Sequence, residues 1–473
     1  MKFTKFGKAL LMSAISVGVV LSVSSCVQSY TVGYLYVTGT VTSESNGNGI
    51  ISAFAIDHNT GRLGPLPGFP IASGGANPVR AILLNGGRFL YVLNRGVNKE
   101  GNGDCTTTDP CLGANITQFT VGANGILTAQ QTFTTQGFNP FRMIGDTSGN
   151  FIMVLEHDSP DNYLPGGTAA TANGCAQALS GPLTCGDISV FQVSPTTGRL
   201  SPILNNAVTV NTAAAGTQNL KYFPVPANPV DFILGGSDVI TMSGTPATAA
   251  VSCASGATSC YPYTGGTTYF PYSYNGSNGQ MGVILSTPQQ LQNITQGTAI
   301  VSAGNIYVLD NEPISVDGVV ASQSQIAAFS AVNGTLSPIL AGQIPDDAHQ
   351  SNPIFMVLEN KSKWFFVANQ GNPADQTDPL SGIAGYVINT PFAPAEIAGP
   401  PIGFGTGGGP QCLVEDPSNQ FFYTANSYDS SVTGQEINNQ SGNLTPLSQS
   451  SKAPDLYVLT GPPTWCLVDG RTN

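Results

Sequence analysis

The sequence predicts an all-β protein, a seven-bladed β-propeller of four-stranded blades. Three observations lead to this fold class: a four-part strand pattern that recurs along the chain, glycine-containing turns between its parts, and a composition poor in charge. Only 9% of the 473 residues are charged, while 56 are glycine and 34 are proline. A coiled coil would be rich in Ala, Glu, Lys and Leu, and a disordered chain would lack the 41% of hydrophobic residues found here.

The first two parts of the repeat are both predicted strands. The first part is a short apolar run that often opens with Asn-Pro, because proline at a strand's first position removes no ladder hydrogen bond. The second part is a run of aromatic and β-branched residues, which strands prefer. Asn-Pro occurs at Asn77, Asn139, Asn228 and Asn352. The second part recurs seven times, near Tyr34, Phe89, Phe151, Val239, Ile306, Phe365 and Phe421.

The third part alternates apolar and polar residues, and the fourth follows a tight turn. The alternation is clear after Ile116, Ile188 and Ile326. The turns before the fourth part contain glycine, as at Gly198 and Gly334, because glycine accepts the positive φ that a hairpin turn needs. Seven repeats of four short strands predict seven blades. The fourth repeat, around residues 228–286, is the least regular.

The two ends of the repeat array predict how the ring closes. The array begins at Tyr34 with a second-part strand that has no first-part strand before it, and it ends with Trp465–Asp469, which looks like a first-part strand. The C-terminal strand should therefore complete the first blade and cover an open edge. Cys412 and Cys466 lie in similar runs of neighbouring inner strands, so a disulfide between them could latch the ring. Aligning the acids of the two runs instead shifts the register by one residue.

The repeated pattern of a glycine turn, Phe89-Leu-Tyr-Val-Leu-Asn, an alternating strand and another glycine turn resembles the lactonase-type seven-bladed propellers. That group includes 6-phosphogluconolactonases, carboxymuconate cyclases and YVTN surface propellers. The resemblance covers about residues 34–470, and it implies the same fold. It also implies one candidate activity, a lactone hydrolase or cyclase acting at the mouth of the central channel.

The N-terminus predicts export and a lipid anchor. Three lysines precede an apolar run from Ala9 to Val23, and two serines then lead to Cys26. A basic segment, a short apolar segment and small residues are typical of an export signal. A cysteine directly after them resembles a bacterial lipobox, which implies cleavage before Cys26 and lipid on its sulfur. An ordinary signal peptide with an incidental cysteine is the alternative.

The chain therefore divides into a signal peptide (1–25), a short tether (26–33) and the propeller (34–473). Val27 in place of aspartate favours the outer membrane, by resemblance to sorted lipoproteins. No other run approaches the ~18 apolar residues of a membrane span, so membrane attachment is expected through the lipid alone. The net charge of −12 becomes −15 when the three lysines of residues 1–25 are removed, which disfavours a nucleic-acid partner. A monomer is expected.

The eight cysteines after Cys26 predict four disulfides, as is common in exported proteins. Metal ligation is the alternative, but no pair has the spacing of a zinc knuckle and the chain has only three histidines. The expected pairs are Cys105 with Cys111, Cys175 with Cys185, Cys253 with Cys260, and Cys412 with Cys466.

One face of the predicted propeller carries long connections and the other carries tight turns. The long connections join second to third strands, at residues 95–113, 157–186, 244–265, 311–323 and 370–381, and they contain the three local cysteine pairs. We expect function on this elaborate face, because binding loops are commonly placed on a rigid scaffold. Neutral insertions are the alternative.

Charged residues recur at equivalent positions near the mouth of the channel on this face. Two arginines could hold a carboxylate or a phosphate, and a glutamate or histidine could act as general base on a lactone. The alternative is a solvated rim in which Arg–Asp pairs tie neighbouring blades. The candidate ligand-binding residues are Arg80, Arg142, Asp231 and Glu312, and the candidate catalytic residues are Glu156 and His157. Polar residues also follow second strands at Arg95 and Gln370.

Neither a cofactor nor a metal is predicted. Asp158 with Asp161 and Asp375 with Asp378 offer the oxygen ligands that Ca²⁺ prefers, but neither pair has the spacing of a calcium loop. Three classes of function stay open: a propeller of the cell envelope that binds a ligand or partner, a lactone hydrolase, and a structural surface protein. The first is favoured, with a small anion, a glycan or an envelope protein as the partner.

Overall fold

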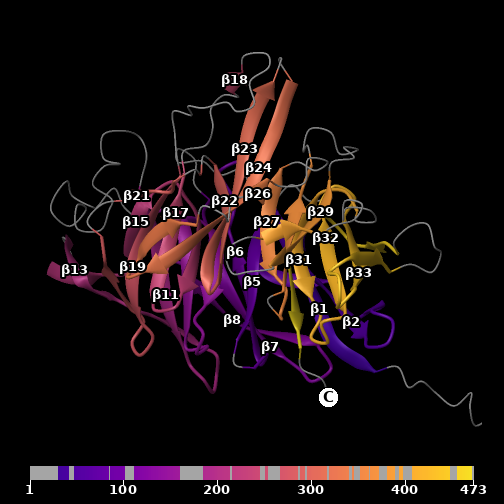
Figure 1. Cartoon of the computed structure of the whole chain (residues 1–473). Helices are drawn as coiled ribbons and strands as arrows, with labels where there is room; N and C mark the ends of the chain where they lie inside the picture. The colour runs from indigo at the N-terminus through magenta and orange to yellow at the C-terminus, as the bar shows by residue number, and fades with distance from the viewer. Residues whose placement is uncertain are drawn as a thin grey trace, which may run out of the picture.

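A computed structural model gives the arrangement of the chain. It describes residues 30–470, with gaps at 42–46, 85, 102–110, 160–184, 213–215, 245–250, 254–266, 286–287, 293, 295, 317–318, 340–343, 346–351, 362, 372–380, 389–393, 398–406 and 448–454. The described residues form strands and turns and no helix, and their strands group into seven blades (Figure 1). The predicted all-β propeller is therefore confirmed.

Each blade is an antiparallel sheet of four strands, ordered from the central axis outward. Blade 1 contains β36 (Pro463–Asp469), β1 (Thr31–Thr40), β2 (Asn48–Asp57) and β3 (Leu63–Pro65). Blade 2 contains β5 (Pro78–Leu84), β6 (Phe89–Asn94), β7 (Asn115–Val121) and β8 (Leu127–Thr134). Blade 3 contains β9 (Phe138–Gly145), β10 (Phe151–Asp158), β11 (Cys185–Val193) and β12 (Leu200–Pro202). Blades 4 and 5 contain β16 (Pro229–Gly235), β17 (Asp238–Ser243), β19 (Thr268–Asn275), β20 (Gln280–Val283); and β22 (Gly297–Ala303), β23 (Asn305–Val316), β24 (Val319–Val332), β25 (Thr335–Pro338). Blades 6 and 7 contain β27 (Pro353–Leu358), β28 (Trp364–Asn369), β29 (Gly382–Ile388), β30 (Pro394–Glu396); and β31 (Pro410–Glu415), β32 (Phe421–Asn426), β33 (Ser431–Ile437), β34 (Leu444–Pro446).

Short additional strands pair with the third strand of five blades. They cover part of an edge that would otherwise be open to pairing with other chains. These strands are β4 (Ile71–Ala76), β15 (Phe223–Ala227), β21 (Gln289–Gln290), β26 (Ile344–Pro345) and β35 (Tyr457–Val458). A separate hairpin of β13 (Asn205–Thr212) and β14 (Gly216–Leu220) lies between blades 3 and 4 along the chain.

The C-terminal strand closes the ring, as predicted. β36 pairs with β1 as the inner strand of blade 1 and also contacts the inner strands of both neighbouring blades, β31 and β5. The remaining inner strands contact one another in blade order, so the seven form a continuous circle. Both ends of the described chain therefore lie on one side of the propeller, at the lower edge in Figure 1.

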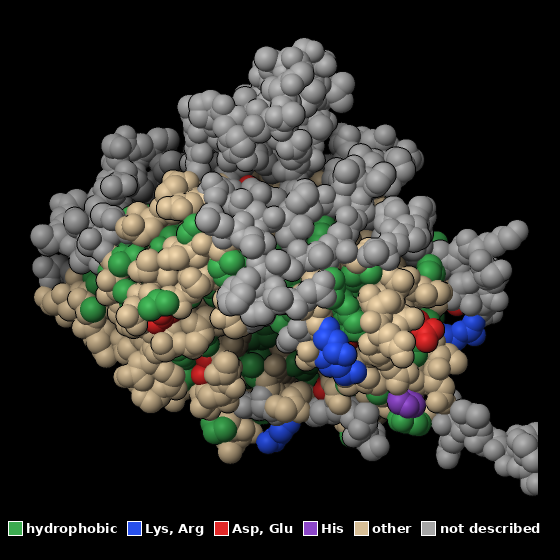
Figure 2. Space-filling model, in the orientation of Figure 1, with side chains coloured by type: hydrophobic (Ala, Val, Ile, Leu, Met, Phe, Trp, Pro, Cys, Tyr) green, Lys and Arg blue, Asp and Glu red, His purple; other side chains and the backbone are tan. Residues whose placement is uncertain are grey.

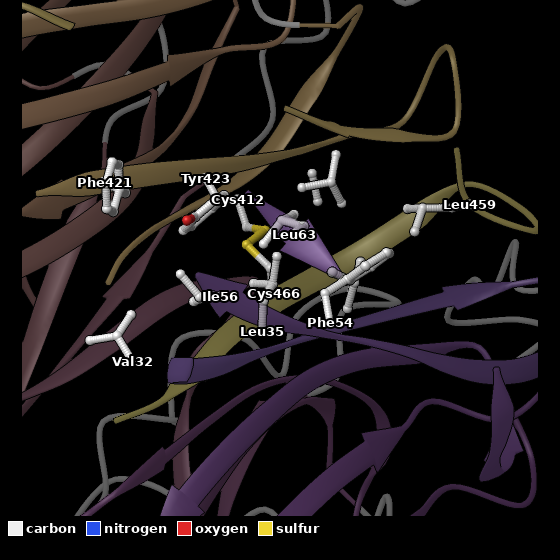
Figure 3. Packing of buried hydrophobic residues seen from close by; sticks show 13 residues of the cluster. Val32, Leu35, Phe54, Ile56, Leu63, Cys412, Phe421, Tyr423, Leu459 and Cys466 are labelled. Carbon is white, nitrogen blue, oxygen red and sulfur yellow. A yellow bond between two sulfur atoms is a disulfide. The ribbon is translucent and has the colours of Figure 1, made fainter. Parts of the chain in front are cut away.

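The predicted latch between Cys412 and Cys466 is present as a disulfide, with Cα atoms 5.9 Å apart. The two runs align by their acids: Asp416 lies six residues after Pro410, and Asp469 lies six residues after Pro463. The cysteines therefore occupy successive positions of neighbouring inner strands, and each reaches across the boundary between blades 7 and 1. Their sulfur atoms lie inside the apolar cluster that fills this boundary (Figure 3).

The inner strands begin with an unusual backbone conformation that explains the Asn-Pro repeats. Asn77, Asn139, Asn228 and Asn352 have φ between 51° and 55°, in the left-handed region. Asparagine tolerates this region better than most residues, and the following proline starts the strand. After each of these prolines the pairing register shifts by one residue, which marks a β-bulge. The other three inner strands carry the same shift.

Neighbouring blades are joined where a second strand meets the next blade's glycine turn. Gly198 has φ of 68°, and a Cβ added there would lie 2.7 Å from the ring of Phe89. The Tyr91 hydroxyl, on the same strand as Phe89, donates a hydrogen bond to the Gly198 carbonyl at 2.6 Å. The same hydroxyl-to-carbonyl contact recurs from Tyr36 to Gly125 and from Tyr423 to Gly61. The repeated tyrosines and turn glycines of the sequence therefore build one repeated joint.

The long connections differ in form from the sequence expectation in one blade. Residues 311–323 were expected to be a loop, but β23 and β24 extend into them as one long hairpin that pairs through Val316 and Val319. A short strand, β18 (Val251–Cys253), pairs with β23 in parallel. The hairpin stands above the rest of the propeller on the elaborate face (Figure 1). Alternating β-branched and small residues in 305–332 favour this extension over a loop.

Candidate functional site

A cavity of about 440 Å³ lies at the mouth of the central channel, where the inner strands begin. Pockets of this size commonly hold small molecules. Charged side chains are sparse on the surface that Figure 2 presents, yet three arginines line this one cavity. The lining residues are Val79, Arg80, Arg95, Phe141, Arg142, Ile354, Phe355, Gln370, Gln411, Pro463 and Thr464.

The β-bulges place these side chains. In the inner strands of blades 2 and 3, the two residues after the proline lie at the register shift, opposite the same part of the second strand, so both can be aimed toward the mouth. Arg80 and Arg142 occupy the second of these positions in blades 2 and 3, as predicted. Arg95 and Gln370 directly follow the second strands of blades 2 and 6 and complete the rim.

Arg80 lines the cavity and is held against an aromatic ring. Its guanidinium carbon lies 3.6 Å from the centre of the Trp465 ring, a cation–π contact. The ring of Phe355 also packs against it, with its centre 5.0 Å away at an interplanar angle of 85°. The Trp465 Nε1–H donates to the Ala81 carbonyl at 3.0 Å, which fixes the indole between blades 1 and 2. The guanidinium of Arg80 is therefore held by a rigid platform.

The electrostatics of the cavity favour an anion. Burial, and then the positive charge of Arg142, lower the pKa of Arg80 well below its usual value, although the nearby Asp231 opposes this shift. A guanidinium nonetheless stays charged at neutral pH. Two crowded and poorly hydrated cations are stabilised by any anion that binds between them.

Arg142 and Asp231 form an ion pair between blades 3 and 4. Arg142 Nε lies 3.1 Å from Asp231 Oδ1, and the same carboxylate accepts from the Phe232 and Ile300 amides. The sequence analysis gave Arg–Asp pairs between neighbouring blades as an alternative to a ligand site, and one such pair is present here. Among the described lining residues there is no aspartate, glutamate or histidine, and Asp231 is the carboxylate that the structure places near both Arg80 and Arg142.

Glu156 lies at the end of β10, is fully buried and does not line the cavity. Its Oε2 accepts hydrogen bonds from the Gly137 amide at 2.8 Å and from the Ser189 hydroxyl at 2.6 Å. Asp310 occupies the same place in blade 5 and accepts from the Gln296 amide at 2.6 Å. A polar residue at this strand end thus holds the backbone of the incoming connection.

Glu156 also faces a second buried carboxyl group, Asp187, its direct neighbour on β11. Burial raises the pKa of Glu156, and burial together with the charge of Glu156 raises that of Asp187. Thr135 also lies within reach of Glu156, and the contact between Glu156 and Asp187 favours a proton shared by the two carboxyl groups.

The other predicted site residues are not brought to the cavity by the described structure. His157 is partly exposed, with Nδ1 3.3 Å from Asp158 Oδ1 and its ring 6.3 Å from that of Phe141. Glu312 lies in the β23–β24 hairpin opposite Gln323, and its side chain is outside the described residues.

Most predicted cysteine sites also lie outside the described residues. These are Cys26, Cys105, Cys175 and Cys260, together with the side chains of Cys185 and Cys253. Cys111 is buried and disulfide-bonded. The described residues contain no group of three or more His, Cys, Asp or Glu side chains placed to hold a metal ion.

Sequence reasoning missed the two aromatic residues near Arg80, Trp465 and Phe355, and the amide side chain of Gln411. Trp465 and Phe355 occupy the same position after the start of their strands as Arg80 does in its own. Gln411 lies one position earlier in blade 7. Aligning all seven inner strands on their first residue would have found all three.

Comparisons with known proteins support the fold. No family model matches the chain, and no curated protein matches it. A periplasmic gluconolactonase of Pseudomonas aeruginosa has a similar structure with a TM-score of 0.57 and 13% identity, covering 92% of this chain and 99% of that one. A proposed 6-phosphogluconolactonase of Bacteroides uniformis has a TM-score of 0.53 and 15% identity over the same shares.

A protein of another description has a comparable likeness. The hypothetical selenium-binding protein of Sulfolobus tokodaii has a TM-score of 0.54 and 9% identity, covering 93% of this chain and 94% of that one. Likeness at such identities concerns the fold and not the chemistry, which must be argued from the cavity itself. The chain is a seven-bladed β-propeller whose structural neighbours include lactonase-type propellers.

Proposed function

We propose that this protein binds a small hydroxylated anion, a carboxylate or a phosphate, at the channel mouth. One observation carries the proposal: Arg80 is stacked on Trp465, crowded by Arg142, and lines a cavity whose described walls contain no carboxylate. This concentration of positive charge occurs in a chain of net charge −12. It therefore favours selection of an anion over a general attraction of anions to the whole surface.

The rest of the cavity suits the hydroxyl groups and carbon skeleton of such a ligand. Gln370, Gln411 and Thr464 offer donors and acceptors, while Phe141 and Ile354 offer apolar surface. Charge-assisted hydrogen bonds contribute about 1.5–3 kcal/mol each. Two arginines would therefore supply more than tenfold in affinity.

A lactone hydrolase is the second candidate, because two structural neighbours are named as lactonases. Opening a sugar lactone produces a hydroxy acid, which is the ligand class that this cavity suits. Binding is favoured over turnover because the described lining offers no carboxylate or imidazole as general base, and because Glu156 is engaged with Gly137, Ser189 and Asp187.

Attachment to the cell envelope through lipid on Cys26 is part of the proposal. The disulfides of Cys412–Cys466 and Cys111 suit an oxidising compartment outside the cytoplasm. Among the residues that the structure describes, no helix is long and apolar enough to span a membrane. Labelling with a palmitate analogue should tag the wild type and not Cys26→Ala. Equal labelling of the variant would contradict the anchor.

The binding test is calorimetric titration of 6-phosphogluconate, gluconate and inorganic phosphate. We expect the wild type to bind at least one of them and Arg80→Ala/Arg142→Ala to bind it more than tenfold more weakly. Arg88→Ala is the matched control, because Arg88 is exposed on a turn at the opposite end of blade 2. Absence of binding to the wild type, or equal affinity in the double variant, would contradict the proposal.

The same protein decides between the two candidates. Opening of gluconolactone and 6-phosphogluconolactone should proceed at the uncatalysed rate if the protein only binds. Turnover that is lost in Arg80→Ala/Arg142→Ala would establish the hydrolase instead. Turnover lost in Glu156→Gln, with the fold intact, would assign Glu156 to catalysis and overturn its purely structural role.

A further inference from the structure

The C-terminal strand β36 connects the ring closure to the cavity. Pro463 and Thr464 line the cavity, Trp465 stacks on Arg80 of its wall, and Cys466 is bonded to Cys412 of blade 7. Four consecutive residues therefore serve both the site and the latch. Trp465 also reaches Ala81 in blade 2 and Phe355 in blade 6. The position of this one ring depends on where β36 lies relative to three other blades.

The disulfide joins the two inner strands that supply this part of the wall. Cys412 follows Gln411, which lines the cavity, and Cys466 follows Trp465. Both half-cystines are buried, with 0% and 4% of their surface exposed, in the cluster between blades 7 and 1 (Figure 3). Moving the two strands apart at this point would move Gln411 and Trp465 with them.

The opposite end of the same boundary has its own tie. The Tyr423 hydroxyl of blade 7 donates to the Gly61 carbonyl of blade 1 at 2.6 Å, on the plain face. Loss of the disulfide therefore removes the covalent tie near the mouth, while the hydrogen bond at the plain end stays in place. This asymmetry makes a local effect on the cavity expected, in addition to any loss of overall stability.

We propose that the Cys412–Cys466 disulfide is a positioning element for the anion site, so that the mouth binds its ligand tightly only in the oxidised protein. The disulfide holds Trp465 beneath Arg80, and Trp465 fixes the guanidinium that contacts the anion. The inference rests on the proposed function and adds redox control to that same site. Trp465 and the disulfide act through Arg80 and contact no reacting atom themselves.

The redox step balances as a thiol–disulfide exchange. The two thiols of Cys412 and Cys466 lose two electrons and two protons as the S–S bond forms, and a disulfide of the exchange partner is reduced to two thiols. A dithiol reductant reverses the step. The co-reactant is therefore any thiol–disulfide couple of the compartment.

The first experiment compares variants of the chain from residue 27 onward, which keeps every strand of the propeller. With 6-phosphogluconate as probe, Cys412→Ala/Cys466→Ala should bind at least tenfold more weakly than the wild type. Tyr423→Phe, which loosens the same boundary at the other end, should keep wild-type affinity. Trp465→Ala should lose affinity, and Trp465→Phe should regain much of it, because a ring for Arg80 is restored.

The outcomes separate this inference from the proposed function. If the wild type binds none of 6-phosphogluconate, gluconate and phosphate, the proposed function fails and the positioning role fails with it. If the wild type binds and the double cysteine variant binds equally well, the positioning role alone is overturned. An equal loss in Tyr423→Phe would also overturn it, because general loosening of the boundary would then explain the effect.

A second experiment needs no variant. Coupling between ligand and disulfide is reciprocal, so a tenfold effect on affinity requires that saturating ligand make the disulfide tenfold harder to reduce. That factor corresponds to about 30 mV for a two-electron couple. Equilibration in dithiothreitol buffers of graded potential, with peptide mapping of Cys412 and Cys466, should show this shift with 6-phosphogluconate and none with glucose. An unchanged midpoint with bound ligand would contradict the coupling.

Discussion

At the scale of single residues, several carboxyl groups in the described part of the chain hold the fold together. Glu156 and Asp187 meet inside blade 3, and Glu415 lies buried beside the turn that joins β27 to β28. An acid whose pKa is raised on folding binds protons more strongly in the folded than in the unfolded state. Stability from such groups is therefore present at low pH and is lost as the pH rises through the folded-state pKa.

The first prediction concerns the shared proton in blade 3. Asp187→Asn should raise the free energy of unfolding at pH 8 by roughly 1–3 kcal/mol, because the new amide can donate to Glu156 without burying a second acid. The gain should shrink toward pH 4, where the wild-type pair holds its protons. Urea unfolding at both values measures the difference. A variant that is less stable than the wild type at pH 8 would show that Asp187 has an essential partner.

The second prediction concerns Glu415, whose burial raises its pKa to about 7. Its Oε2 accepts from the Asn360 amide at 2.7 Å, a bond that a glutamine carbonyl retains. Glu415→Gln should therefore stabilise the protein by roughly 1–3 kcal/mol at pH 8 and much less at pH 5. Thermal unfolding across this range is the measurement. Asp429→Asn, at an exposed position, is the control and should show no such pH dependence.

At the scale of elements, the repeated sequence pattern encodes the contact between neighbouring blades as well as the strands of each blade. The first ring of a second strand packs on the next blade's turn glycine, and in three blades a tyrosine hydroxyl binds that glycine's carbonyl. Recurrence of the aromatic run and the glycine turn therefore reflects a contact between repeats. This contact is what allows seven marginal sheets to share one folded state.

The third prediction tests the joint at Gly198. Gly198→Ala should cost more than Gly86→Ala, because both glycines have positive φ but only at Gly198 would the Cβ meet Phe89. Backbone strain alone costs roughly 1–2 kcal/mol, so Gly86→Ala should lose about that amount. Gly198→Ala should lose at least 1 kcal/mol more, and Tyr91→Phe about 1 kcal/mol. Equal losses of unfolding free energy at the two glycines, measured by urea unfolding, would show that the contact between Gly198 and Phe89 does not stabilise the protein.

At the scale of the whole molecule, stability depends on closing the circle. β36 comes from the far end of the sequence and supplies the inner strand of blade 1, so the contacts that close the ring span most of the chain. The disulfide then covalently joins blade 7 to that strand. Such long-range contacts form at a cost in loop entropy, and the disulfide lowers the separate cost of holding β36 beside blade 7.

The fourth prediction follows from the length of the closed loop. The two cysteines are 54 residues apart, which corresponds to about 4 kcal/mol in the chain-entropy model. Cys412→Ala/Cys466→Ala should lower the free energy of unfolding by about that amount and leave the β-sheet circular dichroism unchanged below the transition. A loss under 1 kcal/mol would show that β36 is held by packing alone.

The sequence was sufficient for the architecture because each repeat shows its own strands and turns. The order of the parts also predicted the closure, since only one inner strand was missing and only one was left over. The cavity was harder to predict. Trp465 and Phe355 look like ordinary strand aromatics, and only the bulge directs them to the mouth. Glu156 was ambiguous because an acid at a strand end has the same sequence signal whether it holds the backbone or faces a ligand.

The bulge recurs at the start of all seven inner strands, so seven equivalent positions lie around the mouth. The pairing register shifts in the same way at all seven, and three of the side chains at these places, Arg80, Arg142 and Phe355, line the cavity. A new side chain at one of these three changes the charge or shape of the mouth. A propeller of this kind can therefore change its ligand by substitutions at a few positions, and laboratory evolution of a new specificity would begin at these three. In this chain the seven equivalent positions hold Arg80, Arg142, Asp231, Ala299, Phe355, Cys412 and Trp465.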